Sequence, residues 1–339
     1  MADAVFSPHP LLRNPHIMTM LPAFRPTRAS ELHSTQQSLI IDVDSESKVM
    51  VHYHKVNANA PCLLLVHGLE GSSNAPYLVN LTAKALPLGF NVARMNLRNC
   101  GGTMHLTPTL YNAGMSSDVI AVARYLRQNM NVSAITAVGY SLGGNVVLKA
   151  AAELSERGDP LFTAAAAVSP AIDLHTAVGA MERGINRVYE LRFILGLRAK
   201  VRAKSAIYPK RFDAGKLKYV TGMRSFDELF TAPDAGYDSA LHYYQGASAL
   251  GRLPNIKIPT LIIAAQDDPI VPFASFRSPQ LQSPYIKLLA PEHGGHGGFI
   301  HSDVEVNDLI KSNDRLWAEN RILEFCMQNL SGTTEYGAD

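Results

Sequence analysis

Short apolar runs alternate with amphipathic stretches over most of the chain after residue 60. The runs are almost continuously apolar, which is typical of strands buried on both faces of a sheet. They cover residues 62–68, 90–96, 134–139, 162–170 and 260–268. The stretches that follow the first three repeat apolar residues at helical spacing, at 76–89, at 116–130 and from residue 142 onward. This alternation predicts an α/β fold, with a mostly parallel central sheet and helices on both faces.

The pattern differs at the two ends of the chain. Residues 1–35 are rich in Pro, Arg and His and follow neither period, so we expect an irregular N-terminal arm. The alternation at 38–43 and 48–56 predicts a hairpin near one edge of the sheet. One domain is therefore expected over residues 36–330, followed by a short C-terminal tail at 331–339.

The alternation of strands and helices lapses between Ser169 and Pro259, which predicts a helical cap inserted at about residues 172–250. Within it, residues 185–218 contain ten Lys or Arg and two acidic residues. This basic segment fits either a solvated helix face or a surface that attracts a carboxylate-bearing substrate or anionic lipid headgroups. In the last case the protein would contact a membrane surface transiently.

Composition narrows the class of protein. Hydrophobic residues make up 47% and charged residues 18%, which supplies a sizeable core and excludes a disordered chain. The formal net charge of +2 is too small to indicate a nucleic-acid partner. Cys62, Cys100 and Cys326 are far apart, which indicates reduced thiols. No secretory signal and no membrane-spanning run stand out, so we expect a cytoplasmic protein.

The sequence GYSLG at 139–143 fits the nucleophile-elbow pattern G-x-S-x-G and stands between an expected strand and an expected helix. A sharp turn there lifts the Ser141 hydroxyl out of the sheet, and the flanking glycines relieve the crowding. The helix that starts at Leu142 directs free N–H groups and its positive dipole end at the reacting atom. Ser141 is the candidate nucleophile, and the Leu142 N–H is a candidate oxyanion donor.

A second oxyanion donor is expected from the loop after an earlier buried strand. The sequence LLLVHGLEGSSN at 63–74 provides such a strand, followed by a glycine-bearing loop. The Leu69 N–H is the candidate donor. His67 and Gly68 also fit a simple turn with a hydrogen-bonding histidine, which is compatible with that role.

A nucleophilic serine needs a base that is itself oriented by a carboxylate, and in this architecture the chain order is Ser, acid, His. Asp267 and Asp268 compete for the acid, and the spacing to the following proline favours Asp268. Of three histidines at 293–301, His296 stands between two glycine pairs and is the candidate base. His293 is the alternative.

Other site chemistries find less support in these motifs. The three histidines lack an H-E-x-x-H or paired-carboxylate pattern, so no metal site is expected. The glycine-bearing loops have neither the G-x-G-x-x-G order of a dinucleotide site nor the lysine of a phosphate loop. No cofactor is expected.

Seven segments in order along the chain together resemble the YheT-like group of α/β-hydrolases. This group includes relatives of the mammalian ABHD phospholipases and of the yeast ethyl-ester synthases. The segments are LRNPHIMTMLP (12–22), HGLEGSSNAPYL (67–78), MNLRNCGGTMHLTPTLY (95–111), GYSLGGN (139–145), SFDELFTAP (225–233), AQDDPIVP (265–272) and GGHGGF (294–299). The resemblance implies that Ser141, Asp268 and His296 form the catalytic triad. Asn99 departs from the pattern, since many hydrolases have glycine after the preceding arginine.

These motifs together predict a serine hydrolase that cleaves carboxylic esters of a small-molecule or lipid-like substrate. Two alternatives stay open. An alcohol acyltransferase, or ester synthase, would use the same triad, and a catalytically silent binding protein would use the same fold.

Overall fold

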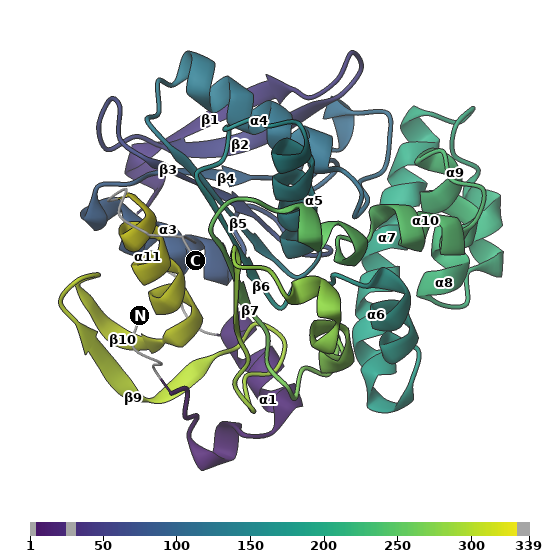
Figure 1. Ribbon diagram of the computed structural model, residues 1–339. Helices are drawn as coiled ribbons and strands as arrows, with labels where there is room; N and C mark the ends of the chain where they lie inside the picture. The colour runs from purple at the N-terminus through teal and green to yellow at the C-terminus, as the bar shows by residue number, and fades with distance from the viewer. Residues whose placement is uncertain (1–4, 25–31, 331–339) are drawn as a thin grey trace.

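An eight-stranded sheet forms the centre of the computed structural model, which describes residues 5–24 and 32–330 (Figure 1). The strands are ordered β1-β2-β4-β3-β5-β6-β7-β8. Their bounds are Gln36–Asp42 for β1, Lys48–His54 for β2, Cys62–Val66 for β3, Asn91–Met95 for β4, Ile135–Tyr140 for β5, Ala164–Val168 for β6, Thr260–Ile263 for β7 and Ile286–Leu289 for β8. From β4 to β8 in this order all pairs are parallel, whereas β1 and β2 form the predicted antiparallel hairpin at one edge.

Helices cover both faces of the sheet, and the predicted α/β class is confirmed. One face carries α4 (Ser116–Asn129) and α5 (Leu142–Glu156), and the other carries α3 (Pro76–Ala85) and α11 (Trp317–Leu330). The apolar runs are continuous because neither face of the sheet is left to solvent.

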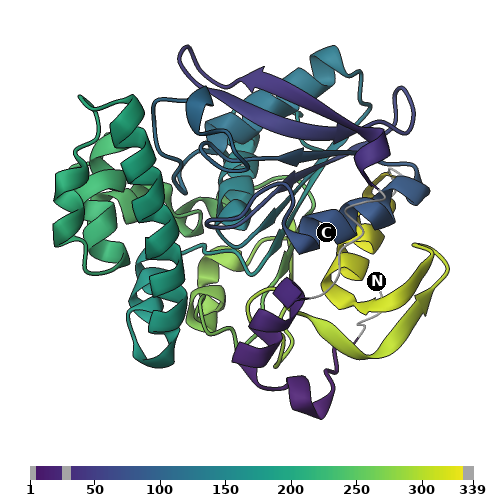
Figure 2. The same cartoon turned by 180° about the vertical axis from the view of Figure 1, so that it is seen from behind.

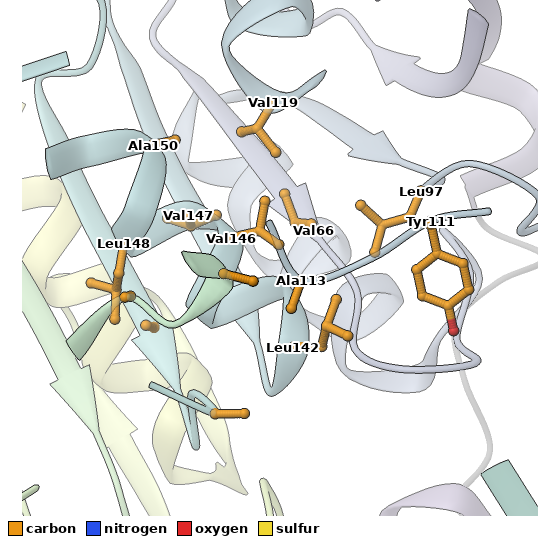
Figure 3. Close-up of a cluster of buried hydrophobic side chains, with 14 of the residues drawn as sticks. Val66, Leu97, Tyr111, Ala113, Val119, Leu142, Val146, Val147, Leu148 and Ala150 are labelled. Atoms are coloured by element: carbon orange, nitrogen blue, oxygen red, sulfur yellow. The ribbon is translucent and has the colours of Figure 1, made fainter. Parts of the chain in front are cut away.

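Successive residues of β3 face opposite sides of the sheet. Leu64 and Val66 pack in the cluster under α4 and α5, and Leu63 and Leu65 pack in the cluster under α3 and α11. Figure 3 shows Val66 beside Val146 of α5. These four side chains are fully buried, and each such burial contributes about 1.5–3 kcal/mol relative to exposure.

The chain between β6 and β7 forms a group of helices to one side of the sheet (Figures 1 and 2). These insertion helices are α6 (Leu174–Met181), α7 (Arg187–Ile207), α8 (Met223–Phe226), α9 (Ala232–Asp234) and α10 (Ala240–Ala247). A π-helical turn, Asp227–Thr231, joins α8 to α9. The lapse in alternation therefore marks a helical segment. Nowhere in the described residues is a helix both long enough and apolar enough to cross a bilayer.

Several C-terminal elements are absent from the sequence prediction. They are β8, the separate hairpin of β9 (Ile300–Asn307) with β10 (Ser312–Leu316), and α11. The strand β8 has four half-buried residues and lacks the length of a clear apolar run. The helix α11 does repeat apolar residues at helical spacing, so this signal was available.

Where the N-terminal arm is described, residues 5–9 have no regular secondary structure, whereas most of residues 10–24 form short helical turns. The longest is α1 (Pro15–Met20), which begins where the Asn14 side chain accepts hydrogen bonds from two backbone N–H groups. Proline at the first helical position has no N–H to satisfy, so it suits this start. The predicted tail at 331–339 lies outside the described residues.

The first turn of α5 lies directly against the end of β3. A Cβ on Gly143 would lie 2.4 Å from the carbonyl oxygen of His67 and 2.5 Å from that of Val66. Backbone atoms cannot yield as a flexible side chain can, so this approach requires glycine.

We therefore expect Gly143→Ala to lower the free energy of unfolding by about 1–3 kcal/mol, as overpacking does in other cores. Urea denaturation measures it. The matched control is Gly179→Ala in α6, where a Cβ would meet nothing within 4 Å. Equal stabilities of the two variants would contradict the close approach of α5 to β3.

Candidate active site

Ser141 lies in a sharp turn between β5 and α5. Its φ of 54° and ψ of −120° belong to a region that L-residues rarely adopt. A hydrogen bond of 2.9 Å from the Ser141 N–H to the carbonyl oxygen of Val168 holds the turn. A Cβ on Gly139 would lie 2.2 Å from the carbonyl oxygen of Gly143, so this position admits no side chain. The strand, turn and helix predicted for this motif are all present.

The Ser141 hydroxyl is one end of a chain of hydrogen bonds. Its Oγ lies 2.8 Å from His296 Nε2, and His296 Nδ1 lies 2.8 Å from Asp268 Oδ2. An ionised carboxylate only accepts, so Nδ1 carries the proton and Nε2 is the acceptor toward the serine hydroxyl. This is the tautomer that a general base needs.

The two aspartates that compete in the sequence have different partners. Asp268 is 9% exposed, and its Oδ1 accepts hydrogen bonds from the N–H groups of residues 270–271 at 2.8 and 2.9 Å. Asp267 Oδ2 instead lies 3.2 Å from His293 Nδ1, and its Oδ1 accepts from the Gly295 N–H at 2.9 Å. Asp268 therefore orients the histidine that bonds Ser141. Asp267 instead bonds two groups of the loop that carries this histidine.

His301 and the three cysteines are not members of the hydrogen-bonded chain that ends at Ser141. His301 Nε2 is 3.4 Å from the carbonyl oxygen of Val5. The three cysteines are buried and free. Within residues 5–24 and 32–330, no group of three or more His, Cys, Asp or Glu side chains is arranged to hold a metal ion.

Two hydroxyl side chains that the sequence analysis did not single out hold the histidine loop. Thr19 Oγ1, on α1, accepts a hydrogen bond from the His296 N–H at 2.8 Å. Ser169 Oγ accepts one from the Gly297 N–H at 3.1 Å. A Cβ on Gly295 would lie 2.7 Å from the Pro15 carbonyl oxygen, so the glycines of this loop let α1 approach. The signals in the sequence were the position of Ser169 directly after a buried strand and that of Thr19 within the segment at 12–22.

His67 shapes the loop that follows β3. It is fully buried, and burial lowers its pKa to about 4, so the ring is neutral near pH 7. Its Nε2 accepts a hydrogen bond from the Leu97 N–H at 3.1 Å. Its Nδ1 therefore carries the proton and donates to the carbonyl oxygen of Gly68 at 2.7 Å. The Gly68 N–H donates to the Tyr77 hydroxyl at 3.1 Å, so the backbone N–H and carbonyl groups of Gly68 are both held.

The candidate oxyanion donors both lie at the cavity that Ser141 lines. Leu69 and Leu142 line a cavity with Ser141, and neither backbone N–H donates to an acceptor within the part of the chain that the structure describes. The Leu142 N–H is free because it belongs to the first turn of α5. Both groups are thus available to a ligand beside the Ser141 hydroxyl.

Two cavities of different character meet at Ser141. The first encloses about 690 Å³, including its mouth, and its walls are mainly apolar. Its apolar residues include Leu174, Ala177, Val178, Met181, Phe193 and Leu197. The second encloses about 1850 Å³, including its mouth, and His296 also lines it. Its polar residues include Thr19, Ser72, Asn74, Tyr77, Tyr189 and Arg192.

The segment at 95–111, which forms one wall of the larger cavity, explains Asn99. This residue has a φ of 64°, which asparagine tolerates better than most residues, and its side chain donates to the Thr109 carbonyl oxygen at 2.7 Å. The preceding Arg98 forms a buried ion pair with Asp118 at 2.6 Å. Asparagine therefore suits this position, whose positive φ glycine would also adopt.

Comparison with known proteins agrees with this fold. A family model described as the alpha/beta hydrolase fold matches residues 61–303. The chain belongs to the α/β-hydrolase family. YheT of Escherichia coli (strain K12), a candidate esterase, is 33% identical over 95% of this chain and 92% of its own length. The YheT-like membership that the motifs indicate is therefore confirmed.

Other relatives of this α/β-hydrolase are more distant. The monoacylglycerol lipase of Saccharomyces cerevisiae is 30% identical over 71% of this chain, which spans 55% of the lipase. Phospholipase ABHD3 of Mus musculus is 27% identical over 73% of this chain and 60% of its own length. The solved Pyrococcus furiosus esterase Pf2001 is similar in structure, with a TM-score of 0.57 and 15% identity over 90% of this chain and 96% of its own. At that identity the likeness shows the fold alone.

The burial of His67 couples stability to pH. Its folded pKa of about 4 lies below its ordinary value of 6.5, so below pH 6.5 the unfolded chain takes up a proton that the folded chain refuses. The contribution of neutral His67 to the free energy of unfolding is complete above pH 6.5 and is lost as the pH falls toward 4. From pH 7 to 5 we expect a loss of about 2 kcal/mol from this residue.

Urea denaturation at both pH values tests this, with His67→Gln expected to lose less stability than the wild type on acidification. His105→Gln, at an exposed histidine, is the control. His54 also has a pKa lowered to about 4 by burial, so part of the pH dependence remains in the variant. The same loss in the wild type and in His67→Gln would contradict a neutral His67.

Proposed function

We propose that this α/β-hydrolase cleaves carboxylic esters through an acyl-enzyme on Ser141. The observation that carries the proposal is the hydrogen-bonded chain from Ser141 through His296 to Asp268, at the junction of two cavities. Its esterase and lipase relatives support the same reaction class.

The mechanism follows from the positions of these groups. Ser141 Oγ attacks the ester carbonyl while His296 Nε2 takes its proton, and Asp268 stabilises the resulting imidazolium. The N–H groups of Leu69 and Leu142 bind the tetrahedral oxyanion, each contributing about 3 kcal/mol. The imidazolium protonates the leaving alcohol, and water activated by the neutral histidine then releases the acid.

The two cavities suggest how the ester lies. An acyl chain gains most from the apolar cavity under α6 and α7, where it loses contact with water. The alcohol part then occupies the larger cavity, which is the more polar of the two and from which water also reaches the acyl-enzyme. The names of the lipase and phospholipase relatives favour a lipid-like ester. We propose that the insertion helices act as the cap that bounds the acyl site.

A second candidate function is alcohol acyl transfer. The yeast medium-chain fatty acid ethyl ester synthase/esterase 2 is 27% identical over 78% of this chain and 61% of its own length. The larger cavity has room for an alcohol in place of water. The triad serves both reactions, so the product decides between them.

We further propose that α7 contacts lipid surfaces. Val188, Leu191 and Leu195 are 64%, 58% and 59% exposed on this helix, although large apolar side chains are usually buried. Arg187 and Arg192 are exposed on the same helix. Apolar side chains flanked by arginines suit the boundary between acyl chains and anionic headgroups.

The nucleophile is tested with Ser141→Ala, assayed against p-nitrophenyl esters from acetate to palmitate. We expect turnover to fall by several orders of magnitude, with unchanged stability, because the nucleophile is lost. In the wild type the rate should peak at one acyl length, set by the apolar cavity. Added ethanol with product analysis separates hydrolysis from acyl transfer.

Each other result of this experiment has a clear meaning. Full activity of Ser141→Ala would show that Ser141 is not the nucleophile. A wild type that neither turns over any ester nor reacts with a fluorophosphonate would instead support the silent binding protein.

The proposed lipid contact of α7 is tested by flotation with vesicles of phosphatidylglycerol or phosphatidylcholine. Leu191→Ser combined with Leu195→Ser should weaken binding to the anionic vesicles about tenfold, because less apolar surface enters the bilayer. Leu241→Ser, at a leucine 49% exposed on α10, is the control. Equal binding by both variants, or no binding by the wild type, would refute this contact.

A further inference from the structure

The proposed oxyanion donor Leu69 lies in a tight turn whose backbone is strained. The Gly71 N–H donates to the Gly68 carbonyl oxygen at 3.1 Å and closes the turn. Its third residue, Glu70, has a φ of 55°. Tight turns normally place glycine or asparagine at a position of positive φ, because a larger side chain is strained there. Interactions of the Glu70 side chain must therefore hold this conformation.

The carboxylate of Glu70 is held by the insertion helix α7. Lys200 Nζ lies 2.9 Å from both of its oxygens, and each side chain of the pair is 14% exposed. One turn earlier on α7, Gly196 faces the same carboxylate, since a Cβ there would lie 2.1 Å from Glu70 Oε2. The helix thus provides both a cation and the space for the carboxylate.

Tyr111 completes the enclosure of Glu70. Its hydroxyl accepts a hydrogen bond from the Glu70 N–H at 2.9 Å and donates to Glu70 Oε1 at 2.7 Å. Burial raises the pKa of Tyr111 well above its ordinary value, so the hydroxyl stays protonated and can donate. Figure 3 shows its ring at the edge of the buried cluster, with the hydroxyl pointing away from the aliphatic side chains.

We propose that Lys200 is a positioning residue for the oxyanion hole. Through Glu70 it fixes the turn that carries the Leu69 N–H, so the hole is complete only while α7 is docked on this turn. Lys200 lines the larger cavity, and its ammonium group bonds Glu70 and not a member of the triad. The inference rests on the proposed function, because it assumes that Leu69 binds the oxyanion.

The arrangement separates transition-state binding from ground-state binding. The Leu69 N–H gains most where negative charge develops, which occurs in the tetrahedral intermediate and not in the bound ester. A displaced donor therefore lowers kcat and leaves KM nearly unchanged. It also weakens the binding of a trifluoromethyl ketone. Ser141 Oγ attacks the carbonyl carbon of this inhibitor and forms a tetrahedral oxyanion, while His296 takes the proton.

The experiment measures kcat, KM and the trifluoromethyl ketone inhibition constant, with p-nitrophenyl butyrate as substrate. Lys200→Met should lower kcat about tenfold, change KM less than about twofold and raise the inhibition constant about tenfold. Lys200→Arg should restore kcat to within about threefold of the wild type, because the charge and its hydrogen bonds return. Arg202→Met, at an exposed arginine of the same helix, is the matched control.

Glu70→Gln serves as a second route, should Lys200→Met fold poorly. It should reproduce the same effects, and the double variant should be no worse than either single one, because the two residues act as one unit. A normal kcat and inhibition constant in Lys200→Met and Glu70→Gln, with Ser141→Ala inactive, would overturn this inference alone. Retained activity in Ser141→Ala would instead overturn the proposed function beneath it.

Discussion

The backbone at Ser141 imposes the constraint on which the rest of the site depends. A non-glycine residue in this conformation costs on the order of 1–3 kcal/mol, so the surrounding structure must hold it. The strand β5 lies near the middle of the sheet, and most of α5 is buried. Gly139 and Gly143 let strand and helix meet without clashes. The position of the hydroxyl is therefore a property of the whole core, and not of a flexible loop.

The parallel sheet brings the other groups of the site to this turn. Strands β3, β5, β7 and β8 run in the same direction, so the loops after their carboxyl ends meet at one edge. Those loops carry Leu69, Ser141, Asp268 and His296 in turn. His67, Ser141, Asp268 and His296 all have hydrogen-bond partners in these loops. The N–H groups of Leu69 and Leu142 have no acceptor in the described residues, which suits a site where negative charge develops.

Segments remote in sequence complete this edge from outside. The helix α1 reaches the histidine loop through Thr19, and α7 reaches the loop after β3 through the ion pair of Lys200 with Glu70. His16 of α1 also bonds the Tyr189 hydroxyl of α7 at 3.0 Å, so the arm and the insertion helices are linked. A movement of either segment would therefore reach both the base and the oxyanion turn.

The sequence alone determined the fold class, because continuous apolar runs that alternate with amphipathic stretches are typical of strands covered on both faces by helices. It also determined the elbow, because its glycines and serine have steric reasons to stand at that spacing. The sequence does not show in which direction a side chain points. Asp267 and Asp268 could therefore be told apart there only by their spacing to the following proline. Only the tertiary structure decided which aspartate faces His296, and only it revealed Thr19, Ser169 and Lys200. Those contacts join separate elements, and they arise when packing sets distant backbones side by side.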